Sequence, residues 1–130
     1  MACLETTFLI DLLRGDVSVS NLMEELQKHE EVLSIAAPSV MELWAGACLS
    51  NASKTEKEKI NELLSSLEVF HLDEKSAKEA GEIEAELMNK GNIIEITDIM
   101  IAAIAKTQSE KVVTRDGHYS RIPGLKMLKY

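Results

Sequence analysis

Four acidic residues from distant parts of the chain each stand beside apolar residues: Glu5, Glu42, Asp98 and Asp116. A carboxylate placed against apolar surroundings costs free energy unless another group compensates its charge. Four such residues indicate one shared compensator, and a hard divalent cation suits carboxylate oxygens. The leading hypothesis from these residues is therefore a metal-dependent hydrolase of phosphodiesters.

Each of the four acids also has an ordinary structural role that the pattern leaves open. Glu42 stands three residues after Ser39, which is the spacing of a helix capping box. Asp98 would complement the dipole of a helix that begins there, Asp116 could belong to a turn, and Glu5 could end a strand. One metal site explains all four residues together, whereas the structural roles would be four independent coincidences.

Apolar stretches that alternate with helical patterns indicate the elements that carry these acids. Strands are expected around Leu4 and over residues 32–37, 69–72, 112–114 and 125–128. Helices are expected over residues 6–15, after a cap at Ser18 or Ser20, from Pro38 to Cys48, after a Ser53–Glu56 capping box, from an Asp73 cap to Gly91, and after a Thr97 cap. This alternation predicts an α/β fold, a three-layer α/β/α sandwich with a largely parallel sheet.

The expected elements can bring the four acids to one crevice. Sheets of this kind bind ligands beyond the carboxyl ends of their strands. Glu5 and Asp116 fall at or just past strand ends, while Glu42 and Asp98 fall in the first turns of helices. Other acids, such as Asp11, are expected to be simply solvated.

Length and composition predict one folded domain over residues 1–130. The chain is 45% hydrophobic and 28% charged, which argues against disorder. No apolar run reaches the roughly 18 residues of a membrane span, and the N-terminus has no signal-peptide pattern, so we expect a cytoplasmic protein without membrane contact. Cys3 and Cys48 lack metal-ligand spacing, and the three histidines are too scattered for a zinc site.

The charge is unevenly distributed along the chain. The formal net charge is -8, which repels nucleic acid at long range. Residues 1–110 carry 9 basic and 21 acidic residues, whereas residues 111–130 carry five basic residues against Asp116 alone. If a phosphate backbone binds the chain, the C-terminal segment is the expected place, with simple solvation as the alternative.

The motifs around the four acids resemble those of the PIN-domain ribonucleases, and within them the VapC-type toxins of toxin–antitoxin pairs. The opening Leu4-Glu5-Thr6-Thr7-Phe8-Leu9-Ile10-Asp11 is similar to the family's first motif, and Ser39-Val40-Met41-Glu42-Leu43 to its second. Asp98 followed by an alanine-rich apolar helix is similar to the third. Thr114-Arg115-Asp116-Gly117-His118-Tyr119 is similar to the closing Thr-x-Asp-x-x-Phe segment.

The resemblance implies an endoribonuclease with an acidic pocket that holds one or two Mg²⁺ or Mn²⁺ ions. Carried over by position, the metal ligands and catalytic acids are Glu5, Glu42, Asp98 and Asp116, with Thr114 and Thr6 in supporting roles. It also implies RNA as the substrate, a VapB-type antitoxin whose tail covers the pocket, and a homodimer. Bound metal would offset the negative charge that otherwise opposes phosphate.

Two residues depart from the family's pattern. The first acid of the family is almost always Asp, and this chain has Glu5; the family often has another acid where this chain has His118. A catalytically weak or inactive PIN domain that acts as a protein-binding module is therefore the alternative. A phosphorylatable receiver domain is disfavoured, because no lysine follows the strand at residues 112–114.

Overall fold

A computed structural model describes residues 1–29 and 32–130 of the chain. Its five strands are β1 (Ala2–Leu4), β2 (Leu33–Ala36), β3 (Glu68–Phe70), β4 (Lys111–Thr114) and β5 (Met127–Lys129). Its helices are α1 (Thr6–Leu13), α2 (Val17–His29), α3 (Ala37–Leu49), α4 (Ser53–Leu64), α5 (Glu74–Asn89), α6 (Ile96–Thr107) and the 3₁₀ helix η1 (Gly117–Arg121). The strands form one sheet in the order β3-β2-β1-β4-β5, and every neighbouring pair is parallel.

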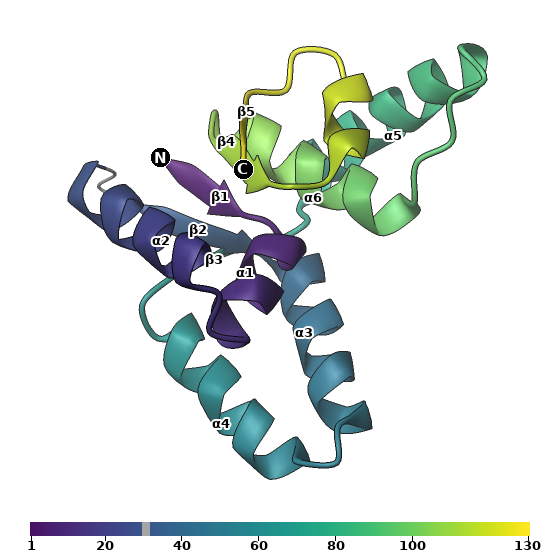
Figure 1. Cartoon of the computed structure of the whole chain (residues 1–130). Coiled ribbons are helices and arrows are strands. Elements are labelled where there is room, and N and C mark those ends of the chain that lie inside the picture. Colours follow the sequence, from purple (N-terminus) through teal and green to yellow (C-terminus); the bar gives the residue numbers. More distant parts are fainter. Residues whose placement is uncertain (30–31) are drawn as a thin grey trace.

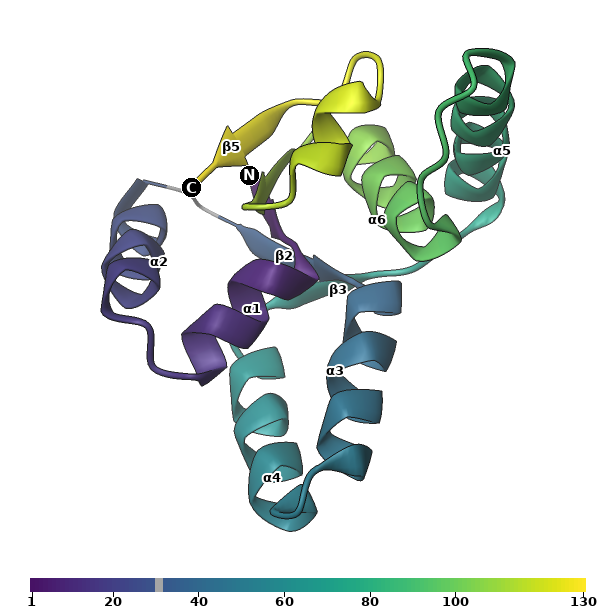
Figure 2. The ribbon, with the colours of Figure 1, turned by 45° about the vertical axis from the view of Figure 1, so that its right-hand side comes forward.

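Successive residues of the central strands point to opposite faces of the sheet, as the pleat requires. In β1, Ala2 and Leu4 join the apolar core beneath α1 to α4, whereas Cys3 joins the core beneath α5 and α6. In β4, Val112 and Val113 divide between the two cores in the same way. Helices therefore cover both faces, as Figures 1 and 2 show, and the predicted three-layer α/β/α sandwich is confirmed.

Two of the predicted helix boundaries are confirmed in detail. Gly15 follows α1 with a φ of 81°, a left-handed conformation that glycine adopts without strain. Asp73 caps α5 by accepting a hydrogen bond from the Ser76 amide at 2.9 Å, and the Asp73 amide donates to Ser76 Oγ in return. This capping box fixes the start of the helix that packs along α6.

The other predicted caps are wrong. Asp16, which lies before Ser18, accepts a hydrogen bond from the Val19 amide at 3.0 Å at the start of α2. No side chain caps α4 or α6, whose N-cap residues are Ala52 and Glu95. Both of these helices begin at or before the expected capping residue, which therefore lies inside the helix.

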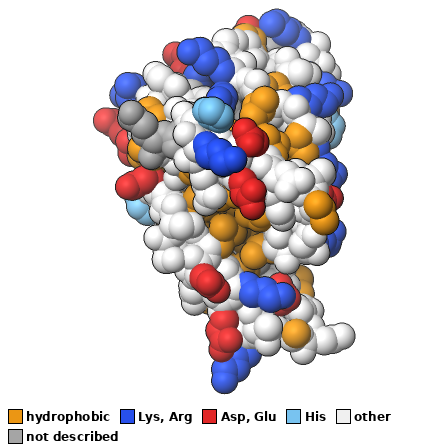
Figure 3. Space-filling view, turned by 60° about the vertical axis from the view of Figure 1, so that its left-hand side comes forward, with side chains coloured by type: hydrophobic (Ala, Val, Ile, Leu, Met, Phe, Trp, Pro, Cys, Tyr) orange, Lys and Arg blue, Asp and Glu red, His pale blue; other side chains and the backbone are white. Residues whose placement is uncertain are grey.

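The outer surface carries charges of both signs. Figure 3 shows Lys, Arg, Asp and Glu side chains intermingled, with hydrophobic side chains between them near the middle of this face. The narrow lower end of the molecule is the α3–α4 pair. Among the described residues, no helix is both long enough and apolar enough to cross a membrane.

Candidate metal site

Glu5 is buried at the junction of β1 and α1, with 3% of its surface exposed. Its Oε2 atom accepts a hydrogen bond from the Thr7 amide at 2.9 Å, so it is the N-cap of α1. Its Oε1 atom accepts from Thr7 Oγ1 at 2.6 Å and also from Thr114 Oγ1. Three donors thus hold one buried carboxylate in a single orientation.

Thr114 connects Glu5 to Asp116 at the carboxyl end of β4. Its side chain is fully buried, and its Oγ1 atom accepts a hydrogen bond from the Asp116 amide at 3.0 Å. Asp116 is the N-cap of η1 and accepts from the His118 amide at 2.9 Å. The hydroxyl of Thr114 thus contacts both the segment that carries Glu5 and the segment that carries Asp116, as a supporting residue would.

Glu42 lies in the second turn of α3, on the side that faces α1. Thr6 Oγ1 donates a hydrogen bond to Glu42 Oε1 at 2.8 Å and lies 2.9 Å from Ser39 Oγ. The capping-box interpretation of Glu42 is wrong, because α3 begins at Ala37 and its N-cap is Ala36. Glu42 is instead held by Thr6, which is the first residue of α1 and directly follows Glu5.

Asp98 lies in the first turn of α6 and is half-buried. Its Oδ1 atom accepts a hydrogen bond from the Tyr119 hydroxyl at 3.1 Å. Burial is the largest cause that raises the pKa of Asp98, to about 6; the Tyr119 hydrogen bond opposes it, and the negative charges of Asp116, Glu5 and Glu42 contribute to the rise. The other three acids therefore act electrostatically on Asp98.

Asp98 and Asp116 form the compact part of this acidic cluster together with His118. Among the described residues, one ligand atom from each of these three lies within 4.8 Å of the others, and Glu5 and Glu42 are outside that group. His118 Nδ1 lies 3.0 Å from Asp116 Oδ1. Carboxylate oxygens with one imidazole suit Mn²⁺, and carboxylates alone suit Mg²⁺, so the donor set fits the expected metals.

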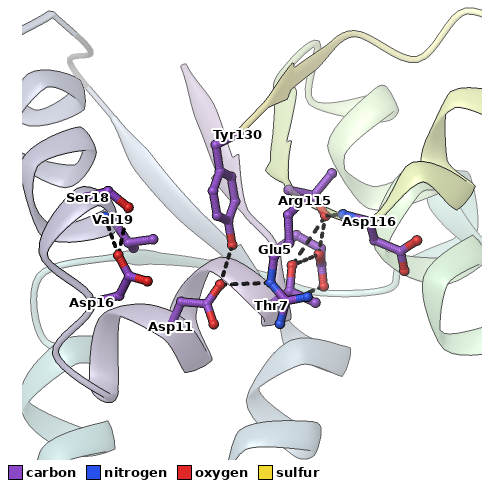
Figure 4. Close-up of polar contacts among 10 residues, drawn as sticks. Glu5, Thr7, Asp11, Asp16, Ser18, Val19, Arg115, Asp116 and Tyr130 are labelled. Atoms are coloured by element: carbon purple, nitrogen blue, oxygen red, sulfur yellow. Dashed lines mark hydrogen bonds and ion pairs between the residues drawn. The ribbon is translucent and has the colours of Figure 1, made fainter.

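A second polar cluster lies beside the acidic one, and it corrects the expectation that Asp11 is simply solvated. Asp11 Oδ2 accepts hydrogen bonds from Arg115 Nε at 2.8 Å and from the Tyr130 hydroxyl at 2.9 Å. These bonds lower the pKa of Asp11, with the Arg115 bond as the largest cause. Figure 4 shows Arg115 and Tyr130 converging on Asp11, with Asp116 on the other side of Glu5. We call these three residues the Asp11 clasp.

A groove of about 460 Å³ opens between α1, α3 and α4 and reaches Glu42 at one end. Its lining combines apolar, small and charged residues: Ile10, Leu13, Arg14, Glu42, Leu43, Gly46, Ala47, Ser50, Glu56, Lys59 and Ile60. The acidic cluster therefore borders a surface that could receive a partly apolar segment.

Sequence reasoning missed three polar contributors to this site. Thr7 binds Glu5 with both its amide and its hydroxyl, and Tyr119 binds Asp98. His118 was noted in the sequence only as a departure from the family's pattern, whereas it lies beside Asp98 and Asp116. Of these three, Tyr119 could have been found from the sequence. A tyrosine at a buried aromatic position needs a polar partner for its hydroxyl.

Comparison with known proteins identifies the family of the chain. The PIN domain family model matches residues 2–125. The chain is 30% identical over 125 residues to the tRNA(fMet)-specific endonuclease VapC of Salmonella typhimurium (strain LT2), covering 92% of this chain and 95% of that protein. It is 31% identical over 109 residues to Ribonuclease VapC2 of Rickettsia felis, covering 83% of this chain and 81% of that protein.

A solved structure extends the likeness over the whole fold. The crystal structure of VapBC2 from Rickettsia felis bound to a DNA fragment from their promoter aligns with a TM-score of 0.92 and 27% identity, covering 99% of this chain and 98% of that one. The sequence match and the shared topology lead to the same assignment. The chain therefore belongs to the PIN-domain family and, within it, to the VapC-type toxins.

Proposed function

We propose that this chain is a metal-dependent endoribonuclease that hydrolyses RNA phosphodiesters as the toxin of a VapBC-type module. The observation that carries the proposal is the acidic cluster, in which burial and three neighbouring acids raise the pKa of Asp98 to about 6. Such a cluster is costly without a compensating cation. The names of the relatives, an endonuclease and a ribonuclease, support the choice of RNA as substrate.

Asp98 and Asp116 would hold the cation, with His118, Glu5 and Glu42 around them. One or two Mg²⁺ or Mn²⁺ ions are proposed, and when bound they supply a Lewis acid that activates water and offsets the charge of phosphate. Thr114 and Thr6 hold Glu5 and Glu42 in fixed orientations. The chain's own contribution is thus an array of carboxylates fixed before substrate arrives.

The groove beside Glu42 is the proposed position of an antitoxin segment. Its lining includes Leu13, Leu43 and Ile60, which suit the apolar face of a helix, and Glu42 would favour a basic side chain of that helix. A VapB-type antitoxin with this pattern would cover the acidic cluster and block RNA. The aligned complex of VapBC2 supports a partner of this class.

A homodimer is also proposed. Met88, Ile93 and Ile96 lie at the α5–α6 junction and are more than half exposed. Exposed apolar residues grouped in this way often mark a protein interface. Light scattering of the purified chain should give twice the mass of one chain, and the variant Ile93→Lys should shift it toward the monomer. A strict monomer at high micromolar concentration would contradict the dimer.

Cleavage of RNA after metal removal tests the proposed function. We also propose that the chain forms one domain and acts in the cytoplasm. For the test, the purified chain is stripped of metal with EDTA. It is then assayed on a tRNA and on single-stranded RNA, with and without added Mn²⁺ or Mg²⁺. Cleavage should need the cation, and Asp98→Asn should reduce it at least about 100-fold. Asp11→Asn is the matched control, because the Asp11 carboxylate, like that of Asp98, accepts a hydrogen bond from a tyrosine hydroxyl.

Three outcomes would separate the proposal from its alternatives. Undiminished cleavage in excess EDTA, or equal effects of the two variants, would contradict the metal mechanism. Cation binding and antitoxin binding without any cleavage would favour the inactive protein-binding module. Glu5 is the residue that favours this second candidate, since three protein donors already bind its carboxylate.

A further inference from the structure

Tyr119 is fully buried in η1, yet its hydroxyl contacts a residue of the candidate site. Its ring belongs to the apolar core beneath α5 and α6, which also contains Ile104 and Ile122. Its hydroxyl donates a hydrogen bond to Asp98 Oδ1 at 3.1 Å. A phenylalanine would fill the same apolar space, so the hydroxyl is the part of this side chain that packing does not explain.

The hydrogen bond restricts a carboxylate that would otherwise rotate. The terminal torsion of an aspartate is broad, and a single acid in the first turn of a helix can present either oxygen outward. The Tyr119 ring is fixed by the core around it, so its hydroxyl is a fixed donor. Oδ1 is therefore engaged with Tyr119, and Oδ2 is left for other ligands.

We propose that Tyr119 is a positioning residue, whose buried hydroxyl orients the Asp98 carboxylate so that Oδ2 is available to the divalent cation. The inference rests on the proposed function, because it needs a cation at Asp98. Outer donors of this kind fix the direction of a ligating carboxylate, and their loss typically reduces metal affinity 10- to 100-fold.

The Asp11 clasp provides a matched comparison within the same molecule. Tyr130 donates to Asp11 at 2.9 Å, which is the same kind of bond as that between Tyr119 and Asp98. Asp11 also has Arg115, however, and it does not belong to the compact group of Asp98, Asp116 and His118. Removing the Tyr130 hydroxyl should therefore leave cation binding unchanged.

The test compares Tyr119→Phe with Tyr130→Phe in the full chain after metal removal. Mn²⁺ affinity is measured by calorimetry and by the electron paramagnetic resonance signal of free Mn²⁺, and RNA cleavage is measured beside it. Tyr119→Phe should weaken Mn²⁺ binding by at least about 10-fold, whereas Tyr130→Phe should stay within about twofold of the unmodified chain. Equal affinities for all three proteins, or an equal loss in both variants, would overturn the inference.

Asp98→Asn in the same titration distinguishes this inference from the proposed function. If Asp98→Asn loses Mn²⁺ binding while Tyr119→Phe keeps it, the role of Tyr119 is wrong and the metal site stands. If Asp98→Asn binds as well as the unmodified chain, both are wrong. Should Tyr119→Phe fail to fold, a crystal structure of the unmodified chain with Mn²⁺ decides: the cation should contact Oδ2 with the Tyr119 bond intact, and contact with Oδ1 in place of the hydroxyl would overturn the inference.

Discussion

Asp11 and Asp98 accept the same kind of hydrogen bond and have opposite electrostatic environments. Each receives a tyrosine hydroxyl, at 2.9 Å from Tyr130 and at 3.1 Å from Tyr119. Arg115 lowers the pKa of Asp11, whereas burial and the surrounding acids raise the pKa of Asp98 to about 6. The difference lies in the counter-charge, which the chain supplies to one carboxylate and not to the other.

This contrast explains why one polar cluster is structural and the other is proposed to bind a cation. The Asp11 clasp joins α1 to the segment after β4 and to Tyr130, which also packs edge-on against Phe8. Its charges are balanced within the chain. In the acidic cluster the fold supplies hydroxyl and amide donors, and these orient carboxylates without neutralising them.

The largest effect is expected from a variant that gives the acidic cluster a positively charged side chain, as Asp11 already has in Arg115. His118→Arg places a positive charge beside Asp98 and Asp116, where the imidazole now lies 3.0 Å from Asp116 Oδ1. We expect RNA cleavage to fall at least about 100-fold and the metal-free chain to melt at a higher temperature. His118→Gln is the control, which removes the imidazole without adding charge and should have a smaller effect. Full activity of His118→Arg would contradict the account.

Glu5→Asp tests whether the donors around Glu5 have adapted to the longer side chain. The shorter carboxylate cannot reach the same positions relative to Thr7 and Thr114, so we expect about 10-fold slower cleavage. The loss of part of the α1 cap should also lower the free energy of unfolding by about 1–2 kcal/mol. Kinetics and urea unfolding measure these two effects. Faster cleavage by Glu5→Asp would show instead that Glu5 impairs the site.

The pH dependence of stability sharpens the comparison at Asp98. A folded-state pKa of about 6, above the ordinary 3.8, means that ionised Asp98 destabilises the metal-free fold above about pH 6. This penalty disappears as the pH falls through 6 toward about 4. Asp98→Asn should therefore be more stable than the unmodified chain at about pH 7.5, with the advantage lost near pH 4. A variant less stable at neutral pH would favour the helix-dipole role of Asp98.

The smallest expected effect belongs to the Asp11 clasp. Tyr130→Phe removes one partly exposed hydrogen bond and should lower the free energy of unfolding by about 1 kcal/mol. Because Asp11 has a lowered pKa, the stability that the clasp contributes should be present at neutral pH and lost in acid. Chemical unfolding at several pH values measures both. A loss of RNA cleavage in this variant would contradict the separation of the two clusters.

The sequence predicted the fold well because hydrophobic periodicity is a local signal. The strands around Leu4 and Val112 and the helix capped by Asp73 follow from residues close together in the chain. The failed caps, such as Thr97, show the limit of this approach, since local capping patterns also occur inside helices.

Contacts across the fold could not be predicted in the same way. Asp11 has its partners 104 and 119 residues away, at Arg115 and Tyr130, and no local pattern relates them. The convergence of the four acids was predicted only because the topology places strand ends at one edge of a sheet. Which oxygen each donor contacts, as with Tyr119 and Asp98, depends on side-chain packing that the topology does not specify.

Anomalous scattering from crystals of the full chain soaked in Mn²⁺ tests the central claim most directly. The claim is that the fold neutralises Asp11 internally and leaves the acidic cluster to a divalent cation. The predicted result is a Mn²⁺ peak about 2 Å from carboxylate oxygens of both Asp98 and Asp116, with none at Asp11. A peak at Asp11, or no peak at the acidic cluster when Mn²⁺ binds elsewhere on the chain, would contradict it.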